Sequence, residues 1–207
     1  MFTIIPVKPF AQAKTRLAPI LATEERTRLS RFLLKRTITL ARQVGEVVVI
    51  SRDNVVRRVA KSAGAWALVE SGVGLNQALS QAVEWVILRG GKAILIVPND
   101  LPLLTVGDLR ELINLDRTTP KMVVAPCHRR EGTNALFLQP PNLIPFAFGP
   151  ASFSQHQRLA RAVGVQPIIY ESPTVALDLD VPDDLIYAKT LSSLADQWPG
   201  VLCGQGE

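Results

Sequence analysis

The sequence predicts an α/β protein in which helices flank a mostly parallel, mixed sheet. Short apolar runs alternate along the chain with longer stretches of helical periodicity, as in strand–helix–strand units. The run 92–97 (KAILIV) is apolar throughout, which is typical of a parallel strand buried on both faces. Glycine closely follows each of the first three predicted helices, where helices commonly end.

The first half of the chain contains four predicted strands and three predicted helices. Thr23 is expected to cap the first helix, which has two glutamates in its first turn, and Gly45 is expected to end it. Asp53 is expected to cap the second helix, and Gly64 to end it. The predicted strands are 2–7, 46–51, 65–69 and 92–97, and the predicted helices are 23–44, 53–63 and 75–88.

The second half is predicted to add a hairpin. Apolar segments 122–125 and 135–138 flank a polar loop that contains Gly132, so this pair can carry an antiparallel strand. The remaining elements are helices at 105–115, 152–163 and from Pro182 to about 195, and strands at 166–170 and 175–179. Because no linker or internal repeat is visible, residues 1–207 are expected to form one domain, with a loose tail from about 197.

Composition excludes several classes of protein. Apolar residues make up 47% and charged residues 20%, which is globular rather than disordered. No apolar run reaches the roughly 20 residues of a membrane helix, and the N-terminus lacks a secretory pattern, so a cytoplasmic protein without a membrane partner is expected. Two cysteines and two histidines form no zinc set, and free thiols are expected.

Positive charge is concentrated in the first third of the chain. Residues 1–70 hold 13 Lys or Arg against 5 Asp or Glu, whereas residues 71–207 hold 10 against 13. A basic region suits a polyanion, either the phosphates of a nucleotide or a nucleic acid. Six of these cations are interleaved with apolar residues on the predicted helix 23–44, and for these six a solvated helix face is the favoured interpretation.

The loop after the first strand carries three cations, Lys8, Lys14 and Arg16. Ligands of open α/β sheets bind beyond the carboxyl ends of the strands, so this loop is a candidate catalytic and nucleotide-binding site. Cations there would neutralise nucleotide phosphates and a departing pyrophosphate. The GxxxxGK[ST] pattern of a P-loop is absent from the sequence, and the alternative is a basic surface loop.

Three aspartates are candidate metal ligands. Asp100 follows the central strand, where a turn aspartate is the alternative. Asp178 and Asp180 alternate on the predicted last strand, so they are expected to project from one face, although Asp180 is also in a position to cap the last helix. Carboxylates at such positions can hold Mg²⁺ that bridges nucleotide phosphates.

Two further segments are candidate ligand contacts. Thr133 follows Gly132, and Gly149 leads into a helix that Ser152 is expected to cap; an anion can bind at such a helix N-terminus. Gly74 and Asn76 begin another helix, where Asn76 is in a position to contact a nucleotide base. For both segments the alternative is a turn and a cap without a ligand.

Five segments, in order and at similar spacing, resemble one family of small nucleotidyltransferases. The family is the 2-phospho-L-lactate guanylyltransferases of coenzyme F-420 biosynthesis, called phosphoenolpyruvate guanylyltransferases in many bacteria. The resemblance runs from residue 2 to about 190 and is carried by IPVKPFAQAKTRLAP, NDLPLL, GTNALFL, FGPASFSQH and ALDLDVPDDL. It differs at 127–131 (CHRRE), where the family is often rich in Asp and Gly, and at Asn99, where the family often has a small residue.

The resemblance implies a Rossmann-like nucleotidyltransferase fold and a reaction between GTP and a small phosphorylated carboxylic acid. It implies no nucleic-acid partner. Its implied phosphoacid-binding positions are Thr133, Gly149 and Ser152; its metal carboxylates, for Mg²⁺, are Asp100, Asp178 and Asp180; its basic loop residues are Lys8, Lys14 and Arg16.

The reaction that follows is attack of the acid's phosphate on the α-phosphorus of GTP. That phosphate is already ionised at neutral pH, so no general base is required, and replacing Asp180 with Ala is expected to abolish turnover. Phosphoenolpyruvate is the expected acceptor, with 2-phospho-L-lactate and 3-phosphoglycerate as alternatives. Two other functions stay open: a nucleotidyltransferase for another cofactor or a sugar phosphate, whose Gly-rich N-terminal loop is absent from this sequence, and a non-catalytic nucleic-acid-binding domain.

Overall fold

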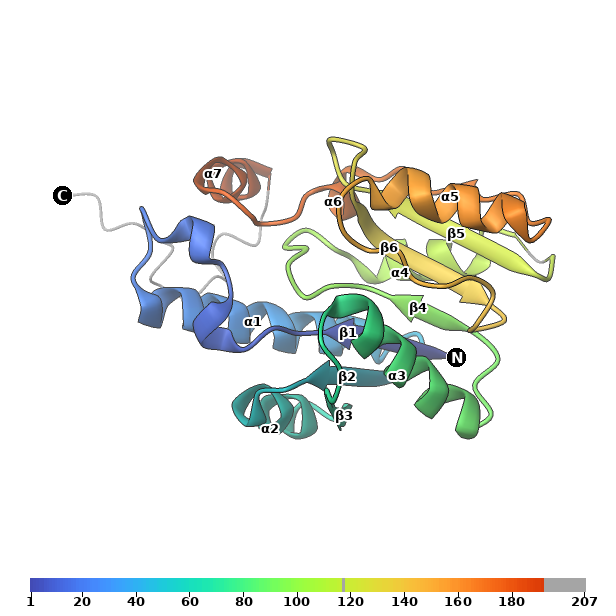
Figure 1. Ribbon diagram of the computed structural model, residues 1–207. Helices are drawn as coiled ribbons and strands as arrows, with labels where there is room; N and C mark the ends of the chain where they lie inside the picture. Colours follow the sequence, from blue (N-terminus) through green and yellow to red (C-terminus); the bar gives the residue numbers. More distant parts are fainter. Residues whose placement is uncertain (117, 192–207) are drawn as a thin grey trace.

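The computed structural model describes residues 1–116 and 118–191, and in this part of the chain it shows one seven-stranded sheet (Figure 1). The strand order is β3-β2-β1-β4-β6-β5-β7. Only β6 runs antiparallel to its neighbours, β4 and β5, whereas the other described pairings are parallel. The predicted mixed sheet and its hairpin are therefore confirmed. The strands are β1 Phe2–Pro6, β2 Glu46–Ser51, β3 Trp66–Val69, β4 Ile94–Ile96, β5 Lys121–Pro126, β6 Thr133–Gln139 and β7 Ile168–Ile169.

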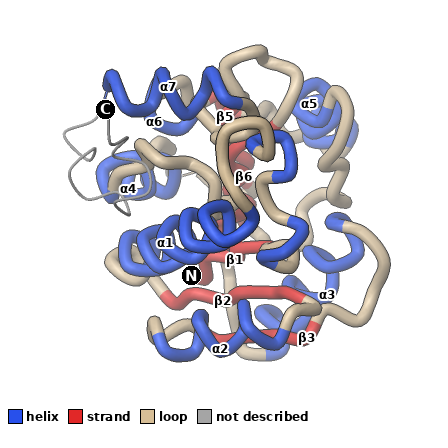
Figure 2. The backbone as a smooth tube through the Cα atoms, turned by 90° about the vertical axis from the view of Figure 1, so that its left-hand side faces the viewer, coloured by secondary structure: helices blue, strands red, loops and turns tan. Residues whose placement is uncertain are grey.

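Helices cover both faces of the sheet, as Figure 2 shows. Buried side chains of α1, α2 and α4 pack on one face, and those of α3 and α5 on the other. None of the described helices is long and apolar enough to cross a membrane. The helices are α1 Thr23–Ala41, α2 Asn54–Ser62, α3 Leu75–Leu88, α4 Val106–Asn114, α5 Ser152–Ala162, α6 Pro173–Ala176 and α7 Pro182–Leu191.

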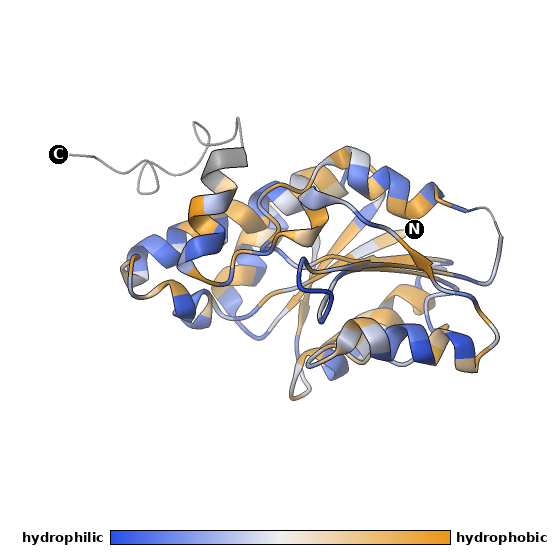
Figure 3. Cartoon of the chain, turned by 90° about the horizontal axis from the view of Figure 1, so that it is seen from above, coloured by the Kyte–Doolittle hydropathy of each residue, from blue (hydrophilic) through white to orange (hydrophobic). Residues whose placement is uncertain are grey.

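Strict alternation in the central strands explains why they are apolar throughout. Val47 and Val49 of β2 belong to the core beneath α1, whereas Val48 and Ile50 belong to the core beneath α3. Successive side chains of a strand point to opposite faces, so both sets must be apolar when both faces are covered. Figure 3 shows the apolar strands between helices whose outer stripes are hydrophilic.

A third core holds one end of the molecule together. Leu17 and Leu21, from the loop after β1, pack with Leu29 of α1, with Leu185 of α7 and with Leu179, which precedes α7. Figure 1 shows α7 beside this loop, although the two segments are far apart in the sequence. The core therefore brings the basic loop and the aspartate-rich segment before α7 to the same end of the sheet.

The first helix begins and ends earlier than predicted. Its N-cap is Ala22 rather than Thr23, and Ala22 N donates to the Glu25 side chain at 2.6 Å. The helix ends at Ala41 rather than at 44, because the next residues form a turn with i to i+3 hydrogen bonds. Asp53, by contrast, caps α2 as predicted by accepting from Val55 N at 2.7 Å.

The predicted strand at 175–179 is wrong. Residues Pro173–Ala176 form the short helix α6, and the chain that follows is extended without a strand partner. Val175, Leu177 and Leu179 are nevertheless buried, and this burial produced the alternating pattern that resembled a strand. The strand predicted at 166–170 is reduced to Ile168–Ile169.

Hydrogen bonds to Asp108 explain why the chain turns between Tyr170 and Thr174. The Asp108 carboxylate accepts from Tyr170 Oη at 2.9 Å, from Ser172 Oγ at 2.8 Å and from Thr174 Oγ1 at 2.7 Å. These bonds hold the hydroxyl-bearing residues around the start of α4, and Pro173 suits the first turn of a helix. The predicted end of the last helix near 195, the loose tail and Cys203 lie outside the described residues, while Cys127 is a free thiol as expected.

Candidate active site

Three of the predicted site segments meet beyond the carboxyl ends of β1 and β4. These strands are parallel neighbours, so the loops that follow them leave the sheet at the same edge. The segment before α7 crosses the same place, because Leu179 N donates to Asp100 O at 3.0 Å. Lys14 and Asp178, which are 164 positions apart in the sequence, thereby come to one edge.

Lys14 links all three segments. Its ammonium donates to Asp100 Oδ2 at 3.2 Å and to Leu179 O at 2.6 Å, and its side chain is only 8% exposed. Its φ of 57° is left-handed, an uncommon conformation for a residue other than glycine and one that tends to occur at functional sites. A buried cation is thus placed where a carboxylate and a main-chain carbonyl converge.

Arg16 and Asp180 form an ion pair at the rim of the same site, with both side chains about half exposed or more. Asp180 does not cap α7, since its own main-chain N and that of Val181 both donate to the Asp184 carboxylate. The Asp180 carboxylate therefore faces the basic loop rather than the helix. Lys8, also of that loop, is exposed.

Asp178 is half-buried next to Asp100. Burial raises the pKa of the Asp178 carboxyl, and the charge of Asp100 raises it further. The two carboxylates are therefore close enough to repel each other. A cation between them would relieve that repulsion.

Asn134 orients Asp178, and the sequence interpretation did not single it out. Its side-chain amide donates to Val175 O at 2.9 Å, to Ala176 O at 3.1 Å and to Asp178 Oδ1 at 3.4 Å. Asn134 is 6% exposed, so this anchor is shielded from water. The only signal in the sequence is its place directly after Thr133.

The carboxylates fit Mg²⁺ by their chemistry, because Mg²⁺ binds one or two carboxylates together with phosphate oxygens and water. The described residues contain no group of three or more His, Cys, Asp or Glu arranged to hold a metal ion. Asp100 and Asp180 instead face Lys14 and Arg16. The residues that could hold Mg²⁺ are Asp100 and Asp178, with Asp180 at the rim, and this assignment stays a prediction.

The second part of the candidate site lies between β6 and α5. Thr133 N donates to Ser152 Oγ at 2.9 Å, and Thr133 Oγ1 lies 3.0 Å from His156 Nδ1. All three residues are buried. The structure thus brings together Thr133 and Ser152, which the family resemblance implies as phosphoacid contacts, and adds His156.

Ser152 does not cap α5, contrary to the prediction. The N-cap is Ala151, with φ of 54° and no side-chain hydrogen bond, because Ser152 Oγ is engaged by Thr133 N. Two amides of the first turn are also used within the protein: Ser152 N donates to Gly149 O and Phe153 N to Glu131 O. These two amides are therefore not free for the anion that the sequence predicts at this helix N-terminus.

A β-bulge in β6 gives Thr133 its orientation. Ala125 pairs with Ala135, but Pro126 pairs with Thr133, so Asn134 is an extra residue in the ladder. Strict alternation would put Thr133 on the face of Ala135, which is the face covered by α1 and α4. The bulge turns Thr133 towards α5 instead, as bulges beside active sites often do.

His156 is fully buried, and burial lowers its pKa to about 4. Because the folded pKa lies below the usual 6.5, the unfolded chain binds more protons between these values, and stability falls as the pH drops through that window. We expect the free energy of unfolding to be about 2 kcal/mol lower near pH 5 than near pH 7.5 on account of this group.

Urea unfolding of the wild-type protein and of His156→Asn at both pH values measures this effect. The variant should lose most of the difference, since asparagine does not titrate. An unchanged pH dependence in the variant would contradict the shifted pKa of His156.

Asn76 connects α3 to the loop before Gly149. Its amide nitrogen donates to Phe148 O at 3.0 Å, and its amide oxygen accepts from Phe148 N at 2.9 Å. Both ends of the amide are thus engaged within the protein. Gly74 is the N-cap of α3, with φ of 93°. Contact of either residue with a nucleotide base stays a prediction.

Arg130, in the loop that differs from the family pattern, is held at the surface. It pairs with Glu171, and its guanidinium lies 5.4 Å from the centre of the Phe153 ring. Its φ of 58° is left-handed. The side chain therefore lies against Phe153, in the first turn of α5.

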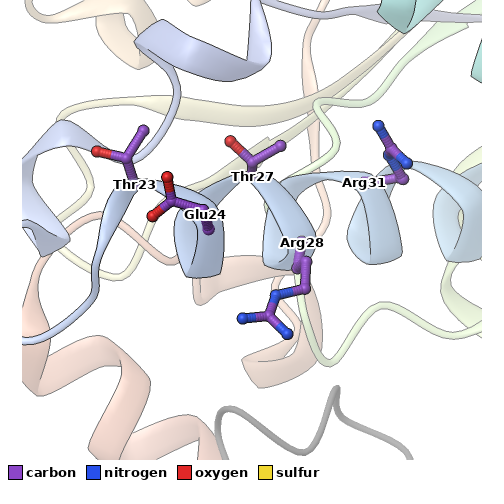
Figure 4. Close-up of a pocket in the computed structure, with 5 residues that line it drawn as sticks. All are labelled: Thr23, Glu24, Thr27, Arg28 and Arg31. Carbon is purple, nitrogen blue, oxygen red and sulfur yellow. The ribbon is translucent and has the colours of Figure 1, made fainter.

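A hollow of about 310 Å³ lies elsewhere, on the exposed face of α1 (Figure 4). It contains none of the predicted site residues. Its basic side chains, Arg28 and Arg31, agree with the interpretation of this helix as a solvated face. The residues that line it are Thr23, Glu24, Thr27, Arg28 and Arg31.

Comparison with known proteins identifies close relatives. A family model described as "Guanylyl transferase CofC like" matches residues 1–188. The phosphoenolpyruvate guanylyltransferase of Rubrobacter xylanophilus is 39% identical over 187 residues, which is 89% of this chain and 91% of that protein. The 2-phospho-L-lactate guanylyltransferase of Methanocaldococcus vulcanius is 37% identical, covering 89% and 82%. The 3-phospho-D-glycerate guanylyltransferase of Colwellia psychrerythraea is 32% identical, covering 97% and 96%.

Solved structures show the same fold at low sequence identity. A candidate nucleotide-diphospho-sugar transferase of Desulfovibrio desulfuricans superposes with a TM-score of 0.77 at 15% identity, covering 94% of this chain and 89% of that one. The 4-diphosphocytidyl-2C-methyl-D-erythritol synthase of Anaerococcus prevotii gives 0.63 at 10%, covering 92% and 94%. The predicted Rossmann-like nucleotidyltransferase fold is confirmed.

Proposed function

Since the chain belongs to the guanylyl transferase CofC-like family, we propose that it transfers GMP from GTP to phosphoenolpyruvate and releases pyrophosphate, in coenzyme F-420 biosynthesis. Guanylyl transfer rests on relatives that are 32% to 39% identical and are named for three different phosphoacids. Phosphoenolpyruvate is proposed because the relative at 39% identity is named for it.

One observation in the structure supports the proposal above all others. Lys14 and Arg16 lie against Asp100 and Asp180 at the edge where β1 and β4 end. Cations beside carboxylates at this edge suit a triphosphate, which needs charge neutralisation on its oxygens and a hard cation to bridge them. The Thr133 and Ser152 hydroxyls supply a separate, neutral contact for the acceptor.

The reaction needs positioning and charge neutralisation rather than proton abstraction. An ionised oxygen of the acceptor phosphate forms a bond to the α-phosphorus of GTP, and the bond to the pyrophosphate oxygen breaks, so pyrophosphate leaves with the electron pair. Both ring nitrogens of the buried His156 are engaged within the protein, so this residue does not act as a base.

Each group at the site has one proposed task. Lys8, Lys14 and Arg16 stabilise the charge that accumulates on the leaving pyrophosphate. Thr133, Gly149 and Ser152 hold the phosphoacid in line with the nucleotide. Asp100 and Asp178, with Asp180 at the rim, would hold Mg²⁺, which supplies charge neutralisation on the phosphate oxygens when it is bound.

A pyrophosphate-release assay with Mg²⁺ tests the function. Four nucleoside triphosphates are crossed with phosphoenolpyruvate, 2-phospho-L-lactate and 3-phosphoglycerate. We expect the highest kcat/KM for GTP with phosphoenolpyruvate, and loss of activity when Mg²⁺ is removed by a chelator. A higher kcat/KM with another acid would correct the acceptor, and no pyrophosphate with any pair would overturn the guanylyl-transfer proposal.

A further inference from the structure

His156 lies four residues after Ser152, so both side chains are on the same face of α5. Ala147 N donates to His156 Nε2 at 3.1 Å, and His156 Nδ1 lies 3.0 Å from Thr133 Oγ1. A main-chain N–H can only donate, so Nε2 is the unprotonated nitrogen of the ring. Nδ1 then carries the proton of the neutral imidazole and donates it to the Thr133 hydroxyl oxygen.

Among the residues that the structure describes, this arrangement leaves the Thr133 and Ser152 hydroxyl protons without an assigned acceptor. The oxygen of Thr133 accepts from His156, so the Thr133 proton is directed elsewhere. The oxygen of Ser152 accepts from Thr133 N at 2.9 Å, so the Ser152 proton is in the same situation. A hydroxyl can otherwise rotate to accept or to donate, and these contacts favour donation by both groups to an anion.

The other side of the imidazole holds the loop that leads to Gly149. Besides the bond from Ala147, the ring lies edge-on to Phe148, with centroids 4.8 Å apart. Asn76 fixes the main chain of Phe148 through both ends of its amide. One buried ring therefore ties the first residue of β6 to the loop before α5.

We propose that His156 is a positioning residue for the phosphoacid, which fixes the Thr133 hydroxyl as a hydrogen-bond donor to an anionic oxygen of that acid. This inference rests on the proposed function, because it takes Thr133 and Ser152 as contacts of the acceptor. His156 itself does not touch the substrate. Its effect is on the affinity for the acid and not on the affinity for GTP.

Two substitutions separate the two ring contacts. In His156→Asn the side-chain amide nitrogen can replace Nδ1 as the donor to Thr133, whereas in His156→Gln the longer side chain can offer an oxygen to Ala147 N but loses that donor. We expect His156→Gln to raise the KM and the equilibrium dissociation constant for phosphoenolpyruvate about tenfold. We expect His156→Asn to raise them less than about threefold, and kcat and the KM for GTP to change little in both.

A double-mutant cycle shows whether the effect passes through Thr133. Thr133→Val removes the hydroxyl, so His156→Gln should weaken binding of the acid no further in that background. Arg158→Gln, on the exposed side of the same helix, is the matched control and should keep wild-type constants. Equal losses in the Gln and Asn variants, or additive losses with Thr133→Val, would overturn the role.

Nitrogen NMR of the wild-type protein tests the inference without any variant. We expect the His156 signals to show a proton on Nδ1 and a bare Nε2 at neutral pH. The opposite tautomer would overturn the proposal even if His156→Gln failed to fold. A wild-type protein that neither binds nor turns over phosphoenolpyruvate would contradict the proposed function. Turnover by the wild type with unchanged affinity in His156→Gln would contradict only the role of His156.

Discussion

Replacing Asp180 with alanine is expected to lower the rate of pyrophosphate release by about a hundred- to a thousandfold, while the protein stays folded. The Asp180 carboxylate is proposed to share the Mg²⁺ that neutralises the phosphates. Among the described residues it is also the carboxylate that pairs with Arg16. The side chain is half exposed, and a surface ion pair contributes about 0 to 1 kcal/mol. The cap of α7 is unaffected because Asp184 provides it.

The matched control is Asp183→Ala, which removes an exposed carboxylate from the first turn of α7 only three residues away. It should keep wild-type turnover. Binding of Mn²⁺, followed by electron paramagnetic resonance in the presence of GTP, should weaken in Asp180→Ala and not in Asp183→Ala. Near-normal pyrophosphate release from Asp180→Ala would refute the metal assignment of this residue.

Replacing Lys14 with methionine is expected to have the second large effect. The ammonium is proposed to stabilise the leaving pyrophosphate, so kcat/KM for GTP should fall about a hundredfold or more. Asp100 would also lose its partner, and because Lys14 is 8% and Asp100 34% exposed, we expect the free energy of unfolding to fall by about 1 to 3 kcal/mol. Lysine and methionine are equally strained by the left-handed backbone at position 14. The substitution therefore tests the loss of the ammonium group.

Steady-state kinetics and urea unfolding separate these two consequences when turnover is measured well below the unfolding transition. Lys35→Met, an exposed lysine of α1, is the control for loss of one positive charge and should keep both properties. A Lys14→Met variant with lower stability but unchanged kcat/KM for GTP would show that Lys14 is only a structural link between Asp100 and Leu179.

The alternation of apolar runs was sufficient to predict the mixed sheet. The helix at 75–88 is observed with the predicted ends, and the strand after it was recognised because burial on both faces leaves a continuous apolar run. The segment 175–179 was misread because buried alternate residues were taken as evidence of a ladder. The contacts that shape it come from Asp108 and Asn134, which lie more than 40 positions earlier, and periodicity does not reveal such contacts.

The candidate site shows the same limit. Parallel strands deliver their following loops to one edge, so the meeting of the Lys14 loop with Asp100 followed from the predicted topology. The pairing of those two side chains, 86 positions apart, depends on tertiary packing. His156 could not be found by its residue type, because an isolated histidine between two glutamines carries no pattern until its partners are placed.

The bulge in β6 fixes the distance between the proposed acceptor contact and the residue that holds a proposed metal ligand. Thr133 faces His156 and Ser152, while the next residue, Asn134, holds the segment that carries Asp178. The anchors of the acceptor and of the metal carboxylate are thus separated by a single peptide unit, about 3.8 Å between Cα atoms. Lengthening a loop cannot change that spacing. We therefore expect the choice between acceptors of different length to depend on residues other than Thr133 and Asn134.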